Sequence, residues 1–149
     1  ASAPGSVLAF LGRVEETQYG LRVDLPVPYA AAVIAATDAL KQQGFGVLTS
    51  IDVRQTLKQK LDYDFRPYVI LGACNPVLAH RALSAELELG LLLPCNVVVY
   101  ERGPGTSTVA AMAPLPAMGL VGNPDVEIVA KEADARLRAA LTSLEKSTA

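Results

Sequence analysis

The sequence contains few of the side chains on which most protein chemistry depends. Its 149 residues include one histidine, two cysteines and no tryptophan, and aromatic residues make up only 5% of the chain. Basic residues form no run and the formal net charge is -2, so we expect no surface for nucleic acid. Since no apolar run approaches the ~18 residues that cross a bilayer, we also expect no membrane span.

Two cysteines are too few for a disulfide framework, and no Cys-x-x-Cys spacing marks a metal site. The short apolar stretch 7–11 has no basic region before it, so it does not read as a signal peptide, and the cytoplasm is the favoured compartment. Hydrophobic residues reach 51% against 19% charged, which is more apolar than a typical soluble domain. One small domain would not bury all of this surface, so we expect a homodimer.

The pattern along the chain predicts a loosely ordered N-terminal arm over residues 1–14 and a single domain over 15–149. Residues 17–25 alternate between apolar and polar, which is typical of a half-buried strand. Further strands are expected over 45–51, 68–73, 96–102 and 106–113. Residues 86–94 read as a leucine-rich connection and 114–122 as a loop.

Helix signals separate these strands. Residues 29–43 carry an apolar stripe and end before Gly44, and Asp52 and Asn75 have the positions of N-caps for two shorter helices. Asn123 followed by proline opens a long last helix. The order β-α-β-α-β-α-β-β-α predicts an α+β fold, a two-layer sandwich with a predominantly antiparallel five-stranded sheet packed by two long helices.

Both cysteines lie in residues 68–96, and each precedes an asparagine, giving the pairs Cys74-Asn75 and Cys95-Asn96. If the strands on either side are antiparallel, both pairs meet at one rim of the sheet. Cys74 stands just before a helix N-terminus, which would lower a thiol pKa and favour a nucleophile or a redox pair. Alternatively, both cysteines are small buried hydrophobes.

Other polar side chains have a structural and a functional interpretation. Asn75 is explained as a cap, whereas Asn96 has no such duty and is the better pocket residue. His80 with Cys74 and Cys95 could supply three metal ligands, or it lies on a helix surface. Asp52 with Lys58 and Lys60 could bind an anionic ligand or do acid-base work; alternatively, Asp52 is a helix cap and the lysines form a solvated face.

Three stretches resemble a known family. Residues 44–53 read GFGVLTSIDV, residues 67–76 read PYVILGACNP and residues 91–97 read LLLPCNV. Together they resemble domain-of-unknown-function family 302 over about residues 19–144. The resemblance implies a small α+β domain, similar in fold to TATA-box-binding proteins, that pairs as a homodimer. It implies no activity, and a similar fold does not by itself imply DNA binding.

The sequence leaves two functions open, and a third interpretation is a purely structural oligomer with no ligand. The leading hypothesis is a dimeric, non-enzymatic domain that binds a small ligand or a protein partner without a cofactor. The rival is a thiol- or metal-dependent enzyme that uses Cys74, Cys95 and His80. The residues expected at a ligand site are Cys74, Asn75, Cys95, Asn96, Lys60 and Asp52.

Overall fold

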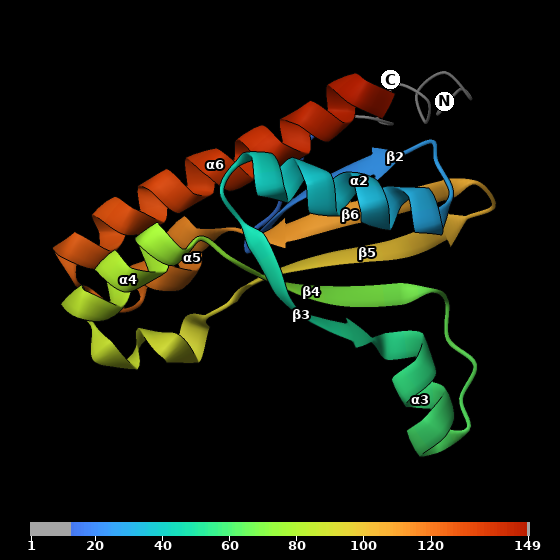
Figure 1. Cartoon of the computed structure of the whole chain (residues 1–149), viewed down its shortest axis with the longest axis horizontal. Coiled ribbons are helices and arrows are strands. Elements are labelled where there is room, and N and C mark those ends of the chain that lie inside the picture. Colours follow the sequence, from blue (N-terminus) through green and yellow to red (C-terminus); the bar gives the residue numbers. More distant parts are fainter. Residues whose placement is uncertain (1–12, 149) are drawn as a thin grey trace.

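A computed structural model describes residues 13–148 and shows a six-stranded antiparallel sheet with helices packed on one face (Figure 1). The strands are β1 (Glu15–Glu16), β2 (Gly20–Leu25), β3 (Gly46–Asp52), β4 (Tyr68–Cys74), β5 (Cys95–Gly103) and β6 (Thr106–Met112). The helices are α2 (Tyr29–Gln42), α3 (Val53–Leu61), α4 (Pro76–Ala85), the 3-10 helix η1 (Leu87–Leu92), α5 (Pro114–Gly119) and α6 (Pro124–Thr148). No described helix combines the length and apolarity needed to cross a membrane.

The order of the strands is β1-β2-β6-β5-β4-β3, and each pair of neighbours is antiparallel. The α+β fold predicted from the sequence is therefore confirmed, whereas the predicted count of five strands is wrong by one. The additional strand is β1, whose two residues are too few to produce a periodic pattern. It precedes the single strand that the sequence predicted from residue 17, and that strand begins only at Gly20.

The N-terminal arm predicted over residues 1–14 lies mostly outside the described residues. Its last residue, Val14, packs against the main core, and its backbone N–H donates to Oε2 of Glu145 at 3.2 Å. The end of the predicted arm is therefore fixed to α6.

The main core lies between the sheet and the helices α2 and α6. Alternate strand residues such as Val23, Val97 and Val109 face these helices and are fully buried. From the helix side, Leu137 and Leu141 of α6 enter the same core, and burying each such side chain stabilises the fold by roughly 1.5–3 kcal/mol. The buried residues of α2 are mostly alanines, which allow this helix to approach the strands closely.

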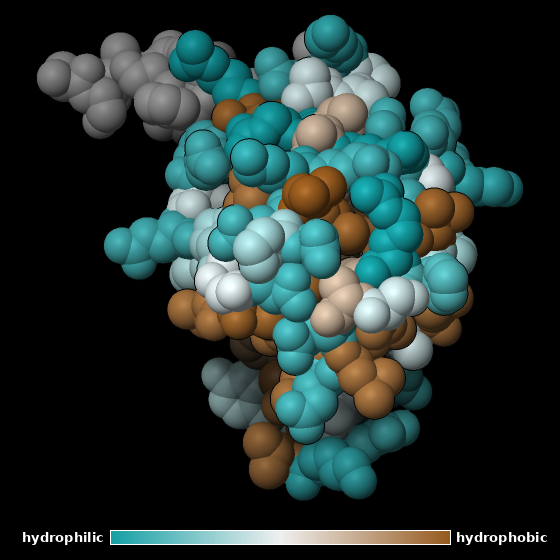
Figure 2. Space-filling model, turned by 90° about the vertical axis from the view of Figure 1, so that its left-hand side faces the viewer, coloured by the Kyte–Doolittle hydropathy of each residue, from teal (hydrophilic) through white to brown (hydrophobic). Residues whose placement is uncertain are grey.

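A second, smaller core lies at one end of the sheet, among α4, η1, α5 and the first turns of α6. Leu78, Leu89 and Met118 are its largest members, and all three are buried. The segment 114–122 predicted as a loop therefore contains a helix, α5, because Met118 anchors it to this core. Likewise, the leucine-rich connection is largely the 3-10 helix η1. Figure 2 views this end and shows apolar side chains exposed among polar ones.

Two predicted helix starts are confirmed by their caps. Asn75 Oδ1 accepts a hydrogen bond from the backbone N–H of Leu78 at 3.2 Å. Asn123 Oδ1 accepts from the N–H of Asp125 at 3.0 Å. In both helices, a proline follows the asparagine at the first helical position, where no intrahelical hydrogen bond is lost with its missing N–H.

The opposite face of the sheet carries no helix in the described part of the chain (Figure 1). Cross-strand pairing places Arg22, Ala110 and Val98 in one row on this open face. Beyond it, α3 projects from the end of β3, and none of its residues is buried. The molecule thus has one closed face, one open face and one protruding helix.

Candidate functional site

The two Cys-Asn pairs meet at one end of the sheet, as the sequence predicted for antiparallel strands. β4 and β5 are antiparallel neighbours, with Ala73 opposite Cys95 and Gly72 opposite Asn96. The helix α4 and the 3-10 helix η1 together return the chain to the end that it left. Both cysteines are free thiols.

A small apolar cavity of about 30 Å³ lies beside both thiols, between the main core and the second core. We call it the cysteine cavity; its lining includes Cys74, Asn75, Leu78, Pro94, Cys95 and Met118. A space of this size holds a water molecule or two but no organic ligand. Three of the four residues in the Cys-Asn pairs therefore border a space too small for a metabolite.

Cys95 is held in its neutral form. Only 5% of its surface is exposed, and burial together with the nearby Cys74 raises its pKa to about 11. Because the thiolate is the nucleophile, such a thiol is almost unreactive at neutral pH. Cys95 behaves as a small core residue, and Cys74 is half-buried beside it.

Asn75 is engaged by the fold on two sides. Its Oδ1 caps α4, and its side-chain amide packs against Gly44, where an added Cβ would lie 2.9 Å from Nδ2. Gly44 also adopts a φ of +84°, which a side chain would strain, and it ends α2 as the sequence predicted. The buried Asn75 therefore locks the start of α4 to the turn between α2 and β3.

The remaining predicted site residues do not join this group. His80 is exposed on α4, and among residues 13–148 no three His, Cys, Asp or Glu side chains are close enough to hold a metal ion, so Cys74, His80 and Cys95 form no such set. Asp52 caps α3 by accepting from the N–H of Gln55 at 2.9 Å.

Asp52 and the exposed Lys60 belong to the opposite end of the sheet. Along the β3–β4 ladder, Gly46 pairs with Cys74 and Asp52 pairs with Val69. Asp52 is six residues along β3 from Gly46, the residue that pairs with Cys74, which corresponds to about 20 Å. Lys60 follows Asp52 on the protruding helix α3, so neither residue can share a small ligand with the cysteines.

Asn96 faces the open side of the sheet, and there the structure contains a much larger space. A pocket of about 410 Å³ lies on the open face across β2, β6, β5 and β4. We call it the sheet pocket; the side chains used below are Tyr19, Arg22, Tyr68, Asn96, Val98, Tyr100 and Ala110. The small side chain of Ala110 leaves the floor of the pocket low between larger neighbours.

Aromatic side chains form one side of the sheet pocket. The rings of Tyr68 and Tyr100 stack with centroids 5.4 Å apart and planes within 6°. Burial, together with the neighbouring Tyr100 and Tyr19, raises the pKa of Tyr68, so its hydroxyl stays protonated at neutral pH. Tyr19 lines the pocket as well and is 81% exposed.

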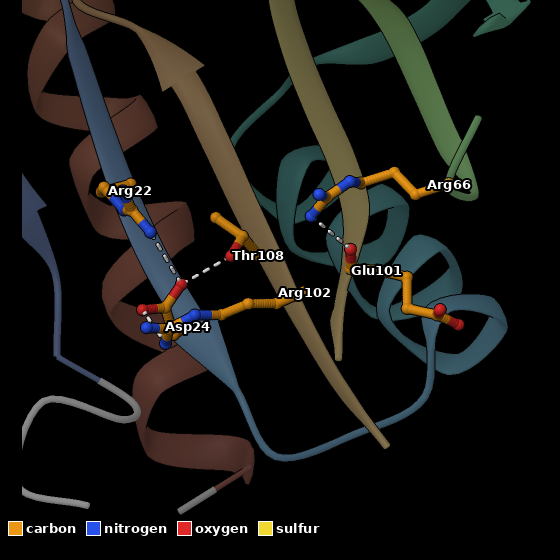
Figure 3. A network of polar contacts seen from close by, with 6 residues as sticks. All are labelled: Arg22, Asp24, Arg66, Glu101, Arg102 and Thr108. Atoms are coloured by element: carbon orange, nitrogen blue, oxygen red, sulfur yellow. Dashed lines mark hydrogen bonds and ion pairs between the residues drawn. The ribbon is translucent and has the colours of Figure 1, made fainter. Parts of the chain in front are cut away.

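Arg22, which lines the pocket from β2, belongs to a charged network (Figure 3). Asp24, which is 4% exposed, accepts hydrogen bonds from Arg22 Nη2 at 3.1 Å, Arg102 Nη1 at 2.6 Å and the Thr108 hydroxyl at 2.6 Å. Burial acts to lower the pKa of Arg22, but the hydrogen bond and charge of Asp24 outweigh it, and the pKa is raised. Arg22 Nε is buried and has no hydrogen-bond partner among the described residues.

A third arginine in Figure 3 lies apart from this network: Arg66 donates a hydrogen bond to the backbone oxygen of Glu101 at 3.4 Å. Sequence reasoning did not select Arg22, Tyr68 or Tyr100 as site residues. The only local signal was the pair of charged residues on one face of the first long strand. Strand pairing is what brings Arg22 and the tyrosines together.

Comparisons with known proteins agree with this architecture. The family model of the domain of unknown function DUF302 matches residues 21–144. A crystal structure described as an uncharacterized conserved protein DUF302 from Bacillus stearothermophilus is 34% identical, with a TM-score of 0.76 over 84% of this chain and 97% of that one. The comparison with curated proteins finds no match. The chain belongs to the DUF302 family.

Proposed function

We propose that this protein is a homodimeric, non-enzymatic domain that binds a small molecule in the sheet pocket. The observation that carries the proposal is the pocket itself, whose volume of about 410 Å³ lies in the range of small-molecule sites. Its walls combine an arginine, an amide and stacked aromatic rings around an apolar floor. Such a mixture orients a ligand by a few polar groups and holds it by apolar contact.

The chemistry of the lining supports binding more than catalysis. Within the part of the chain that the structure describes, the sheet pocket is lined by no Cys, His, Asp or Glu side chain. The raised pKa of Tyr68 removes it as a base at neutral pH. What remains are donors, acceptors and rings suited to recognition.

The dimer is supported by the exposed surface of β3 and α3. Leu48 and Leu61 are both 69% exposed and Ile51 is 51% exposed. β3 is an edge strand, and its only charged residue is the terminal Asp52, so it lacks the charges that usually protect an edge. A second copy, related by a two-fold axis, would pair with this edge and cover the apolar side of α3.

The binding proposal is tested by filling the pocket. Ala110→Leu adds volume to the floor on the open face, where no helix is displaced, and Ala135→Leu makes the same change at an exposed site on α6. Ligand-observed NMR with a fragment library should give hits that Ala110→Leu abolishes and Ala135→Leu retains. An absence of hits that depend on the pocket floor would refute the proposal.

The dimer proposal is tested by light scattering at micromolar concentration. Wild type should have twice the chain mass of 15.7 kDa. Leu48→Lys should give the monomer mass because it introduces a charge at the proposed interface. Ile34→Lys, at a comparably exposed site on α2, should remain dimeric. A monomeric wild type would refute the proposal.

A further inference from the structure

We propose that the ligand of the sheet pocket is a planar aromatic carboxylate, with its carboxylate on Arg22 and its ring system against Tyr68 and Tyr100. This inference rests on the proposed function and adds the chemical class of the ligand. Three features of the pocket carry it: an unused donor, a lining that contains a guanidinium and no carboxylate among the described residues, and a flat aromatic and apolar surface at the right distance.

The unused donor is Nε of Arg22. This nitrogen is buried and has no hydrogen-bond partner within residues 13–148, although Nη2 of the same guanidinium is bonded to Asp24. Leaving a buried N–H unpaired is costly, so folded proteins rarely retain one without a reason. Because the Arg22 side chain lines the sheet pocket and is 34% exposed, a small rotation of its guanidinium would bring this N–H to an acceptor atom of a ligand bound there.

The charge beside this donor favours an anionic acceptor. Asp24 is shared between Arg22 and Arg102, so two guanidinium groups surround one carboxylate. Glu15 lies opposite Arg22 on β1, on the side away from the tyrosines, and its charge also acts on Arg22, so these four charges balance. The described residues that line the pocket itself, however, include the Arg22 guanidinium and no Asp or Glu side chain, and a carboxylate matches the charge of a guanidinium.

The surface next to Arg22 suits a ring system. Arg22, Ala110 and Val98 lie in one cross-strand row, and two strand spacings, about 10 Å, separate the first from the last. This distance accommodates a carboxylate with one or two fused rings. The small Ala110 and the apolar Val98 provide a flat floor, and the stacked rings of Tyr68 and Tyr100 adjoin it. Aromatic rings prefer such offset or edge contacts with other rings.

The experiment compares three probes by isothermal titration calorimetry. The probe 2-naphthoate combines the ring and the charge, 2-naphthamide keeps the ring without the charge, and decalin-2-carboxylate keeps the charge without the aromatic ring. We expect 2-naphthoate to bind at least tenfold more tightly than either of the others. Equal binding of 2-naphthamide would overturn the role of the charge, and equal binding of decalin-2-carboxylate would overturn the role of the ring.

Variants assign the contact to Arg22. Arg22→Gln should weaken 2-naphthoate at least tenfold while the fold persists, because Asp24 keeps its bonds from Arg102 and Thr108. Arg22→Lys should recover part of the affinity by restoring the charge. The matched control Arg66→Gln, which removes a charge outside the network, should change affinity less than twofold. Unchanged affinity in Arg22→Gln would overturn the inference.

Failure of this inference is distinguishable from failure of the proposed function. If 2-naphthoate does not bind, but neutral fragments bind and are lost in Ala110→Leu, the ligand class is wrong and the pocket is still a binding site. If no compound of any class depends on Ala110, both the ligand class and the binding function are refuted.

Discussion

Removing the Asp24 carboxylate should destabilise the protein more than its position on an open face suggests. The face carries no described helix, yet Asp24 is 4% exposed and Thr108, one of its donors, is 0% exposed. In Asp24→Ala, the Thr108 hydroxyl loses its acceptor in a buried place, which costs about 1–3 kcal/mol. The side chains of Arg22 and Arg102 are 34% and 44% exposed, so water compensates them partly, and each lost ion pair costs at most about 1 kcal/mol.

Together these contributions predict a loss of about 3 kcal/mol for Asp24→Ala. Urea denaturation followed by far-UV circular dichroism, at fixed protein concentration, should lower the midpoint by about 1–2 M, given a slope of roughly 2 kcal/mol per M for a small domain. The control Glu16→Ala removes a surface ion pair with Arg138, in which the Glu16 side chain is 65% exposed, and should cost at most about 0.5 kcal/mol.

A double-mutant cycle with Thr108→Val tests the physical reason. In wild type this substitution should cost about 1 kcal/mol, because it removes one hydrogen bond to Asp24. In the Asp24→Ala background it should be neutral or stabilising, because it removes the orphaned hydroxyl. An equal cost of Thr108→Val in both backgrounds, or a loss below 1 kcal/mol for Asp24→Ala, would refute the reasoning.

Three further predictions concern the caps and the thiols. Asn75→Ala and Asn123→Ala should each lower the free energy of unfolding by about 1 kcal/mol, and unchanged denaturation midpoints in both would contradict their capping role. Burial raises the pKa of the Cys95 thiol from 9.0 to about 11, so the folded state favours the protonated thiol. The contribution of this thiol to the free energy of unfolding should therefore be full below pH 9 and lost as pH rises to 11. The loss amounts to at most about 3 kcal/mol. Cys95→Ala should therefore flatten the decline of stability over this range, although Tyr68 continues to contribute above pH 10, and an unchanged decline would refute the assignment. Alkylation without reductant should label both cysteines in the unfolded protein. In the native protein it should label Cys74 much faster than Cys95, because Cys95 is buried. Equal labelling rates in the native protein, measured by mass spectrometry, would contradict the burial of Cys95.

Local signals in the sequence were sufficient for most elements of the fold. Asn-Pro pairs predicted the starts of α4 and α6 because an N-cap and a first-turn proline depend only on neighbouring residues. The alternation along β2 and the stripe along α6 likewise follow from the periods of a strand and a helix. By contrast, β1, η1 and α5 are too short to show a period, and they form because of what they pack against.

The candidate site was predicted less well because residues adjacent in sequence point to opposite faces of a strand. Cys95 and Asn96 were grouped into one site, yet Cys95 enters the closed side beside the cysteine cavity and Asn96 enters the sheet pocket. The period of two along a strand makes this separation inevitable. It becomes visible only when one knows which face the helices cover.

By itself, the sequence determined the fold class, the main helices and strands, the caps and the family, because these depend on local pattern and motif. Only the tertiary structure decided where a ligand would fit. The sheet pocket joins Arg22, Tyr68, Asn96 and Ala110 from four strands, and no local pattern encodes which strands are neighbours. Pairing between distant strands is set by the packing of the whole core, so the site emerges only after the chain has folded.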